Sequence, residues 1–131
     1  MGEPKPTVQE ERAACPLYTA IGVIEGRWKP MLFQRLARRP CGFGELHRAM
    51  PGISRKVLTE QLRQMEDDDL VMRRETGDRL GSVRYALTPY GETLLPVFQS
   101  LWQWGTAHLA RPGAQRGTLV VPPESLPLGA L

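Results

Sequence analysis

Residues 52–66 read GISRKVLTEQLRQME and predict an amphipathic helix that begins just after Ser54. Gly52 interrupts the preceding segment, and a serine at the N-cap accepts a hydrogen bond from a free backbone N–H of the first turn. At about 100° per residue, three apolar residues fall on one face, which predicts the side buried in the core: Leu58, Leu62 and Met65. The opposite side combines basic and hydrogen-bonding side chains. Such a face is typical of helices that contact DNA, but also of ordinary solvated helices.

Two short extended segments follow this helix, at residues 70–74 and 82–87. Their apolar residues recur at every second position, and Gly77-Asp78 and Gly81 supply turn residues between them. The pattern predicts a β-hairpin with a polar tip that contains arginine. A helix with a basic outer face followed at once by a hairpin is the order of a winged helix-turn-helix. In that fold the helix enters the major groove, and the hairpin lies along the DNA backbone or the minor groove.

The segment upstream supports the same fold. Residues 29–37 predict a short helix with Pro30 in its first turn, where proline is tolerated, and Arg39-Pro40 ends it. Residues 43–50 predict a second short helix, closed by Pro51-Gly52. A glycine in the turn before the next helix fits a helix-turn-helix motif. Residues 43–50 would then be the first helix of that motif.

Several short motifs in this order resemble the HxlR-type winged helix-turn-helix regulators of bacteria. They include GRW at 26–28, FGEL at 43–46, GIS at 52–54 and YALT at 85–88. The resemblance covers roughly residues 15–105. It implies a mainly α fold (α+β), with a two-stranded β wing and flanking N- and C-terminal dimerisation helices. It also implies a cytoplasmic, homodimeric transcription factor that binds a palindromic operator in double-stranded DNA.

Two of the departures from the family pattern bear on the recognition helix and the wing. Asp69 stands where the family usually has glycine at the end of the recognition helix. Aspartate tolerates the left-handed backbone conformation better than most residues, so the helix end is expected to survive. Arg84 stands where the family usually has an acidic residue, which adds a basic residue to the wing.

Basic residues concentrate in the part of the chain expected to face DNA. The formal net charge is only +3, but residues 27–56 hold eight basic residues and one acidic residue, which leaves a local charge of +7. We expect Arg55 to contact bases, because arginine suits bidentate contact with guanine, and Arg63 to contact phosphate. The residues predicted to contact DNA are Lys29, Arg39, Ser54, Arg55, Lys56, Thr59, Arg63, Arg79 and Arg84.

The two ends of the domain predict a dimer interface. Residues 17–24 predict a short helix entered through Pro16, and Thr88-Pro89 predicts the capped start of a longer helix that continues through Trp104. Its apolar content exceeds what one side of a thin winged helix needs, and aromatic residues are enriched at interfaces. The alternative is a helix buried within one subunit. The predicted interface residues are Leu17, Ile21, Leu94, Phe98, Leu101 and Trp102.

Cys15 is the candidate sensor of a chemical signal. It directly precedes Pro16, hence the start of a helix, and a helix N-terminus favours the thiolate form, which is the form that reacts. The resemblance implies the same role, because the cysteine near the N-terminus senses oxidants or electrophiles in some members. The alternative is a small buried apolar residue without a redox role. Cys41 lies in a Pro-Cys-Gly turn, is expected to be exposed, and fits either a neutral loop residue or a resolving thiol.

The remaining features define the domain and exclude other classes. We expect a flexible arm over residues 1–12, the domain over residues 13–110 and a Pro/Gly-rich tail over residues 111–131. His47 and His108 do not stand at metal-ligand spacing, and no phosphate loop or nucleophile elbow is present. We therefore expect no metal, cofactor, membrane span or enzymatic activity. The expected function is a sequence-specific repressor. Two alternatives are a winged helix that binds protein or small ligands, and a ligand-responsive regulator of the MarR or PadR type.

Overall fold

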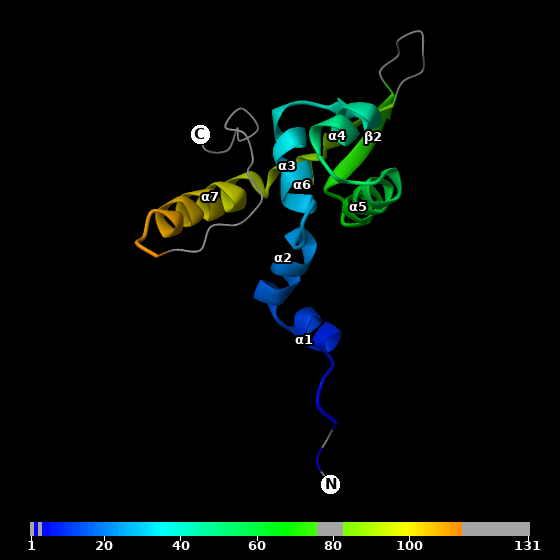
Figure 1. Cartoon of the computed structure of the whole chain (residues 1–131). Helices are drawn as coiled ribbons and strands as arrows, with labels where there is room; N and C mark the ends of the chain where they lie inside the picture. The colour runs from blue at the N-terminus through cyan, green and yellow to red at the C-terminus, as the bar shows by residue number, and fades with distance from the viewer. Residues whose placement is uncertain (1, 3, 76–82, 114–131) are drawn as a thin grey trace.

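The computed structural model describes residues 2, 4–75 and 83–113, and shows a small helical body with a sheet along one side (Figure 1). The elements in chain order are α1 (Val8–Ala14), α2 (Pro16–Ile24), α3 (Lys29–Arg38), β1 (Cys41–Gly42), α4 (Phe43–Ala49), α5 (Arg55–Asp67), β2 (Val71–Glu75), β3 (Val83–Leu87), α6 (Pro89–Glu92) and α7 (Leu95–Leu109). This is the predicted winged helix-turn-helix: α4 and α5 form the motif, and β2 and β3 form the wing.

The recognition helix α5 begins and ends as the sequence predicts. The Ser54 hydroxyl accepts from the Val57 N–H at 3.1 Å, and Leu58, Leu62 and Met65 are at most 1% exposed. At the other end Asp69 adopts φ 60°, in the left-handed region. The amides of Asp69 and Leu70 donate to Glu66 and Met65 carbonyls, both at 2.9 Å. This pair of bonds is a Schellman motif, so aspartate fills the position that usually needs glycine.

The sheet has three strands in the order β1-β3-β2, all antiparallel. The hairpin register pairs Val71 with Leu87 and Glu75 with Val83, which confirms the predicted wing strands. The third strand was not predicted. Cys41 pairs with Tyr85 and is 6% exposed, so the expectation of an exposed turn at Cys41 is wrong. A strand of only two residues is too short to show the alternation that identifies strands in a sequence.

The N-terminal segment also differs from the expectation. Helix α1 begins at Val8, inside the stretch expected to be a flexible arm. The Thr7 amide donates to the Glu10 carboxylate at 2.7 Å, and the Glu10 amide donates to the Thr7 hydroxyl at 3.1 Å. This reciprocal pair is a capping box, which satisfies backbone donors that the start of a helix leaves free.

The predicted C-terminal helix is divided in two. Its start is confirmed: the Thr88 hydroxyl accepts from the Gly91 amide at 2.8 Å. The helix then ends at Glu92, and α7 begins at Leu95. Pro96 explains the break, because it has no N–H to donate to the Glu92 carbonyl one turn earlier.

The core lies between the three central helices and the sheet. Leu32, Leu46 and Leu58 are completely buried, one from each of α3, α4 and α5. Phe98 joins α7 to this core by stacking on Phe33 with ring centroids 4.2 Å apart. In Figure 1, α1, most of α2 and the end of α7 project away from this body. They leave apolar side chains uncovered.

Candidate nucleic-acid interface

The exposed face of α5 presents the side chains predicted to contact DNA. Arg55, Lys56, Thr59 and Arg63 are all exposed. The Thr59 hydroxyl donates to the Arg55 carbonyl at 2.8 Å, which leaves its oxygen able to accept from a ligand. The Ser54 hydroxyl is occupied as the helix cap, so its first role is to fix the start of α5.

The turn between α4 and α5 is held by contacts that the sequence did not predict. His47 Nε2 lies 3.1 Å from the Ile53 carbonyl oxygen, and the His47 ring stacks parallel to Phe43. The Arg55 guanidinium lies 5.8 Å from the centre of the Phe43 ring. Ile53 itself is buried, and Gly52 takes φ 89°. These contacts fix the direction in which α5 leaves the turn, so His47 is a positioning residue rather than a simple surface residue.

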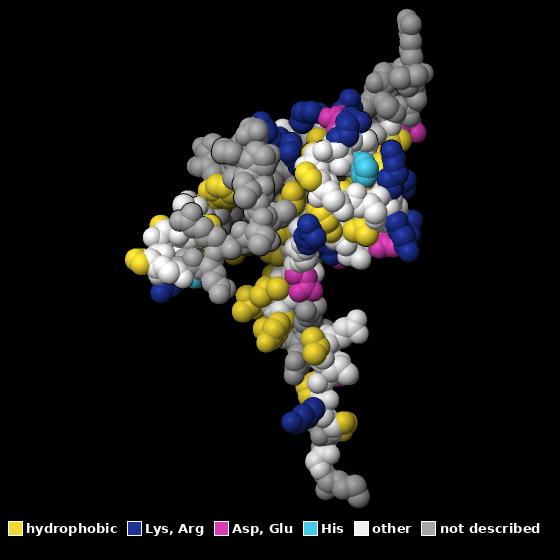
Figure 2. Space-filling view, viewed as in Figure 1, with side chains coloured by type: hydrophobic (Ala, Val, Ile, Leu, Met, Phe, Trp, Pro, Cys, Tyr) yellow, Lys and Arg dark blue, Asp and Glu magenta, His cyan; other side chains and the backbone are white. Residues whose placement is uncertain are grey.

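A second group of basic residues surrounds Glu45. Arg39 Nη2 lies 2.8 Å from one carboxylate oxygen, and Arg84 Nη1 donates to the other at 2.8 Å. The pKa of Glu45 is held below its ordinary value first by the Gly42 amide and then by Arg39. Glu45 therefore remains charged and joins the end of α3 to β3. Figure 2 shows Lys and Arg side chains along the edge over α3 and α4 and along the edge over α5.

The positions of Lys29 and Arg84 bear on whether each residue is free to contact DNA. Lys29 is only 8% exposed at the start of α3, so it is buried and we leave it out of the interface. Arg84 lies on the wing, within β3 and opposite Gly42 and Arg74, but it donates to Glu45. Arg79 and the turn glycines at 77 and 81 lie outside the described residues.

The two cysteines have different environments. Cys15 is half-buried at the N-cap of α2, and its carbonyl accepts from the Thr19 amide at 3.0 Å. Cys41 is buried, its thiol donates to the Arg39 carbonyl at 3.4 Å, and burial raises its pKa. A thiol that resists ionisation is a poor nucleophile, so Cys41 lacks the properties of a resolving thiol in this conformation.

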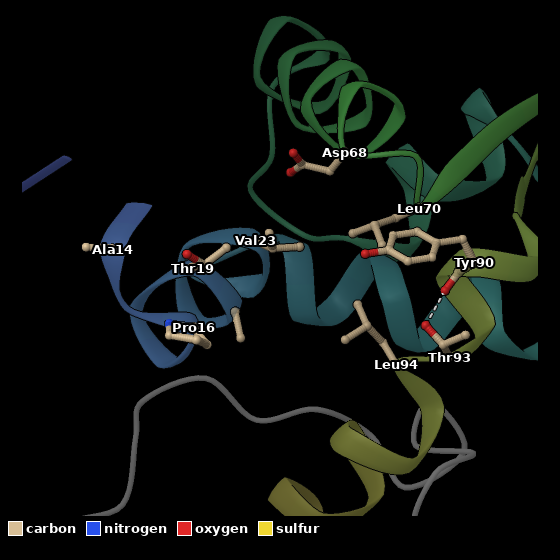
Figure 3. A pocket seen from close by; sticks show the side chains of 10 residues that line it. Ala14, Pro16, Thr19, Val23, Asp68, Leu70, Tyr90, Thr93 and Leu94 are labelled. Carbon is tan, nitrogen blue, oxygen red and sulfur yellow. Dashed lines mark hydrogen bonds between the residues drawn. The ribbon is translucent and has the colours of Figure 1, made fainter. Parts of the chain in front are cut away.

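A mostly apolar groove begins beside Cys15 (Figure 3). Its volume is about 590 Å³, and it lies between α2 on one side and Tyr90 and Leu94 on the other. Ala14 and Pro16, the two neighbours of Cys15, line the groove, and Asp68 and Leu70 cover another side. A molecule in this groove would therefore lie close to the Cys15 backbone.

Large apolar side chains remain exposed on the projecting helices. Leu17 is 67% exposed and Ile21 43% on α2, and Leu101 is 49% and Trp104 68% on α7. Leu94 and Trp102 are half-buried. Phe98 is buried in the core of one chain, so the interface prediction fails for this residue. Isolated exposed apolar residues are ordinary, whereas here several lie on the two projecting helices.

Within the described part of the chain, no helix is long and apolar enough to cross a membrane. The same residues contain no group of three His, Cys, Asp or Glu side chains arranged to hold a metal ion.

Comparisons with known proteins agree with this geometry. The family model of the HxlR-like helix-turn-helix matches residues 23–112. The curated Bacillus subtilis protein YybR, an uncharacterised HTH-type transcriptional regulator, is 33% identical over 104 residues, which are 79% of this chain and 83% of YybR.

Solved structures show the same fold. The redox regulator HypR in its reduced form has a TM-score of 0.68 and 33% identity, over 73% of this chain and 95% of HypR. Reduced YodB from B. subtilis has a TM-score of 0.67 and 31% identity, over 76% of this chain and 97% of YodB. YodB has also been solved after diamide treatment and with quinone bound. The chain belongs to the HxlR-like helix-turn-helix family and is a transcriptional regulator rather than an enzyme.

Proposed function

We propose that this regulator is a homodimeric repressor that reads a palindromic operator through α5. The observation that supports this most directly is the exposed face of α5, where Arg55, Lys56, Thr59 and Arg63 lie together beside a turn held by His47. Arginine near the start of a recognition helix suits bidentate contact with guanine, whereas Arg63, farther along, suits phosphate. Arg79, which lies between the two wing strands in the sequence, would add a backbone or minor-groove contact.

The exposed apolar side chains of α2 and α7 support the homodimer. Leu17, Ile21, Leu101 and Trp104 are each more than two-fifths exposed in the single chain. A second copy that covers them would bury aromatic and aliphatic surface together, as protein interfaces do. A two-fold axis between the copies would place the two α5 helices about one DNA turn apart, or a multiple of it.

Cys15 is the proposed site of the signal. The residue is half-buried, it is followed by the first turn of α2, and its neighbours line the groove of Figure 3. The thiol would add across an electron-poor double bond, such as the C=C of a quinone or the N=N of diamide: one bond to sulfur forms, the π bond of the acceptor breaks, and the thiol proton moves to the acceptor. Helix α2 also presents Leu17 and Ile21, so an adduct at its start would press on the proposed dimer surface and change the spacing of the two α5 helices. The reduced, diamide-treated and quinone-bound structures of YodB support this proposal by likeness.

A second candidate is regulation by a small ligand without covalent chemistry. The groove favours it, because its mostly apolar lining includes Tyr90, Thr93 and Asp68, which could orient a ligand. In this alternative the protein still binds DNA, but the signal is a ligand bound in the groove rather than a modification of the Cys15 thiol.

Fluorescence anisotropy tests these proposals together. The protein is titrated onto its own upstream DNA and onto a scrambled duplex at fixed salt, reduced and after diamide, as wild type and as Cys15→Ser. We expect tight binding to the upstream DNA that diamide abolishes in wild type but not in Cys15→Ser. Tight binding that diamide does not change in either protein would reject the thiol switch and favour regulation by a ligand in the groove. Equal, weak binding to both duplexes would reject the operator.

A further inference from the structure

A cleft lined by arginines lies between α3 and α4, away from the exposed face of α5. Arg35 lies in the last turn of α3, Arg39 is the extended residue that follows the helix, and Arg48 lines the cleft from α4. The cleft has a volume of about 320 Å³, and Glu45 and Cys41 line it as well. We call these five residues the arginine cleft. Arg38 lines a neighbouring depression together with Arg35 and Arg39, which extends the positive surface.

Arg48 is placed by a glycine. A Cβ added at Gly44 would lie 3.1 Å from Arg48 Nη1, so the guanidinium lies directly over the bare backbone of the first turn of α4. Among the described residues Arg48 forms no ion pair. Its five N–H donors are thus available to a ligand in the cleft.

The one carboxylate in the cleft is already compensated. Glu45 accepts from Arg84 and from the Gly42 amide with one oxygen and pairs with Arg39 through the other. Each of these arginines keeps donors that the pair does not use, because a guanidinium has five. Cys41 adds no negative charge, since burial raises its pKa. The cleft therefore has a net positive charge, from three arginines and one carboxylate.

Basic side chains also form two groups on one face of the molecule. Figure 2 shows Lys and Arg side chains over α3 and α4 and again over α5, with a histidine between the two groups. Arg39 and Arg84, which share Glu45, extend this surface towards the outer part of the wing strands, where Arg84 pairs with Arg74. Guanidinium groups recognise phosphate through paired N–H donors better than a point charge does.

We propose that the arginine cleft binds a phosphoryl group, and that this group is a backbone phosphate of DNA outside the groove that α5 enters. The inference rests on the proposed DNA binding but assigns a contact beyond the recognition helix and the wing. Such a contact carries no sequence information. It fixes the orientation of the protein and lengthens the stretch of DNA that the protein needs.

The salt dependence of DNA binding measures the contact. Affinity is measured from 50 to 200 mM salt on the upstream DNA and on the same duplex trimmed to the two half-sites that α5 contacts. The proteins are wild type, Arg48→Gln and the matched control Arg111→Gln, which removes an exposed arginine after α7. Because each phosphate contact adds about 0.9 to the salt slope and the proposed homodimer has two clefts, Arg48→Gln should lose about twelvefold less affinity than wild type over this range on the long duplex. On the trimmed duplex wild type and Arg48→Gln should have the same slope, and Arg111→Gln should match wild type on both.

Calorimetry with inorganic phosphate separates the two sources of the phosphoryl group. Phosphate binding that Arg48→Gln abolishes, together with an unchanged slope on the long duplex, would overturn the DNA assignment in favour of a free anion. An unchanged slope and no phosphate binding would overturn the cleft as a phosphoryl site. A reduced slope in Arg48→Gln, with equal wild-type affinity for upstream and scrambled DNA, would support the cleft and reject the sequence-specific operator.

Discussion

Asp69 offers a direct test of how the recognition helix ends. It has φ 60° in the Schellman motif of α5, and left-handed geometry costs an ordinary L-residue about 1–2 kcal/mol, although less for aspartate. Glycine removes that cost but adds about 0.4–1 kcal/mol of backbone freedom to the unfolded chain. Loss of a negative charge at a helix C-terminus adds about 0.3–1 kcal/mol of stability. We therefore expect Asp69→Gly to raise the free energy of unfolding by about 0.5–1 kcal/mol.

The neighbouring residue is the matched control. Asp68 has the same side chain but φ −83°, which every L-residue adopts without strain. Asp68→Gly removes the same charge and adds the same freedom to the unfolded chain, so it should be neutral or destabilising. Urea denaturation followed by circular dichroism, at one protein concentration, measures both variants. Equal changes in the two variants, or a loss of stability in Asp69→Gly, would refute the strain argument.

Further predictions concern packing, sequence reading, the dimer, the thiols and the ion pair. Gly91→Ala should destabilise the fold by about 1–3 kcal/mol in urea, because its Cβ would lie 2.2 Å from the Leu70 carbonyl oxygen; a neutral effect would show that α6 can shift. Arg55→Ala should cost about 1–3 kcal/mol per half-site of the operator and relax the preference for one base in each, which selection from a randomised duplex measures. Trp104→Ser should shift the protein to monomers in sedimentation, whereas Val83→Ser, on the wing, should not; equal behaviour would exclude α7 from the interface. Iodoacetamide should label native Cys15 before Cys41, and urea should remove the difference. Because the pKa of Glu45 is lowered in the folded protein, its contribution to stability is present above about pH 4.5 and lost as pH falls. In the acidic range, the free energy of unfolding of Glu45→Gln should therefore depend less on pH than that of wild type.

The parts of the fold that were predicted are those with a periodic or capping signal. Three buried residues on one face of α5 and the Ser54 cap located the recognition helix. Thr88 with Pro89 located the start of α6 in the same way. The capping box of Thr7 and Glu10 was a readable signal as well, but it lay in a polar stretch that was interpreted as an arm.

The parts that were missed depend on contacts between distant segments. Strand β1 exists only because Cys41 meets Tyr85, which lies 44 residues later in the chain. The burial of Lys29 and the insertion of Phe98 against Phe33 are likewise products of tertiary packing. The pairing of Arg39 and Arg84 through Glu45 joins three elements, so charge counts along the chain could locate the basic surface but not its geometry.

The central claim is that a two-fold dimer places two copies of α5 in neighbouring major grooves. Hydroxyl-radical footprinting of the upstream DNA tests it most directly, with wild type and Arg55→Ala compared at equal salt. We predict two symmetry-related protected patches on one face of the duplex, about one helical turn or a multiple of it apart, which Arg55→Ala weakens together. Protection spread evenly along the DNA, or a single unpaired patch, would contradict the account.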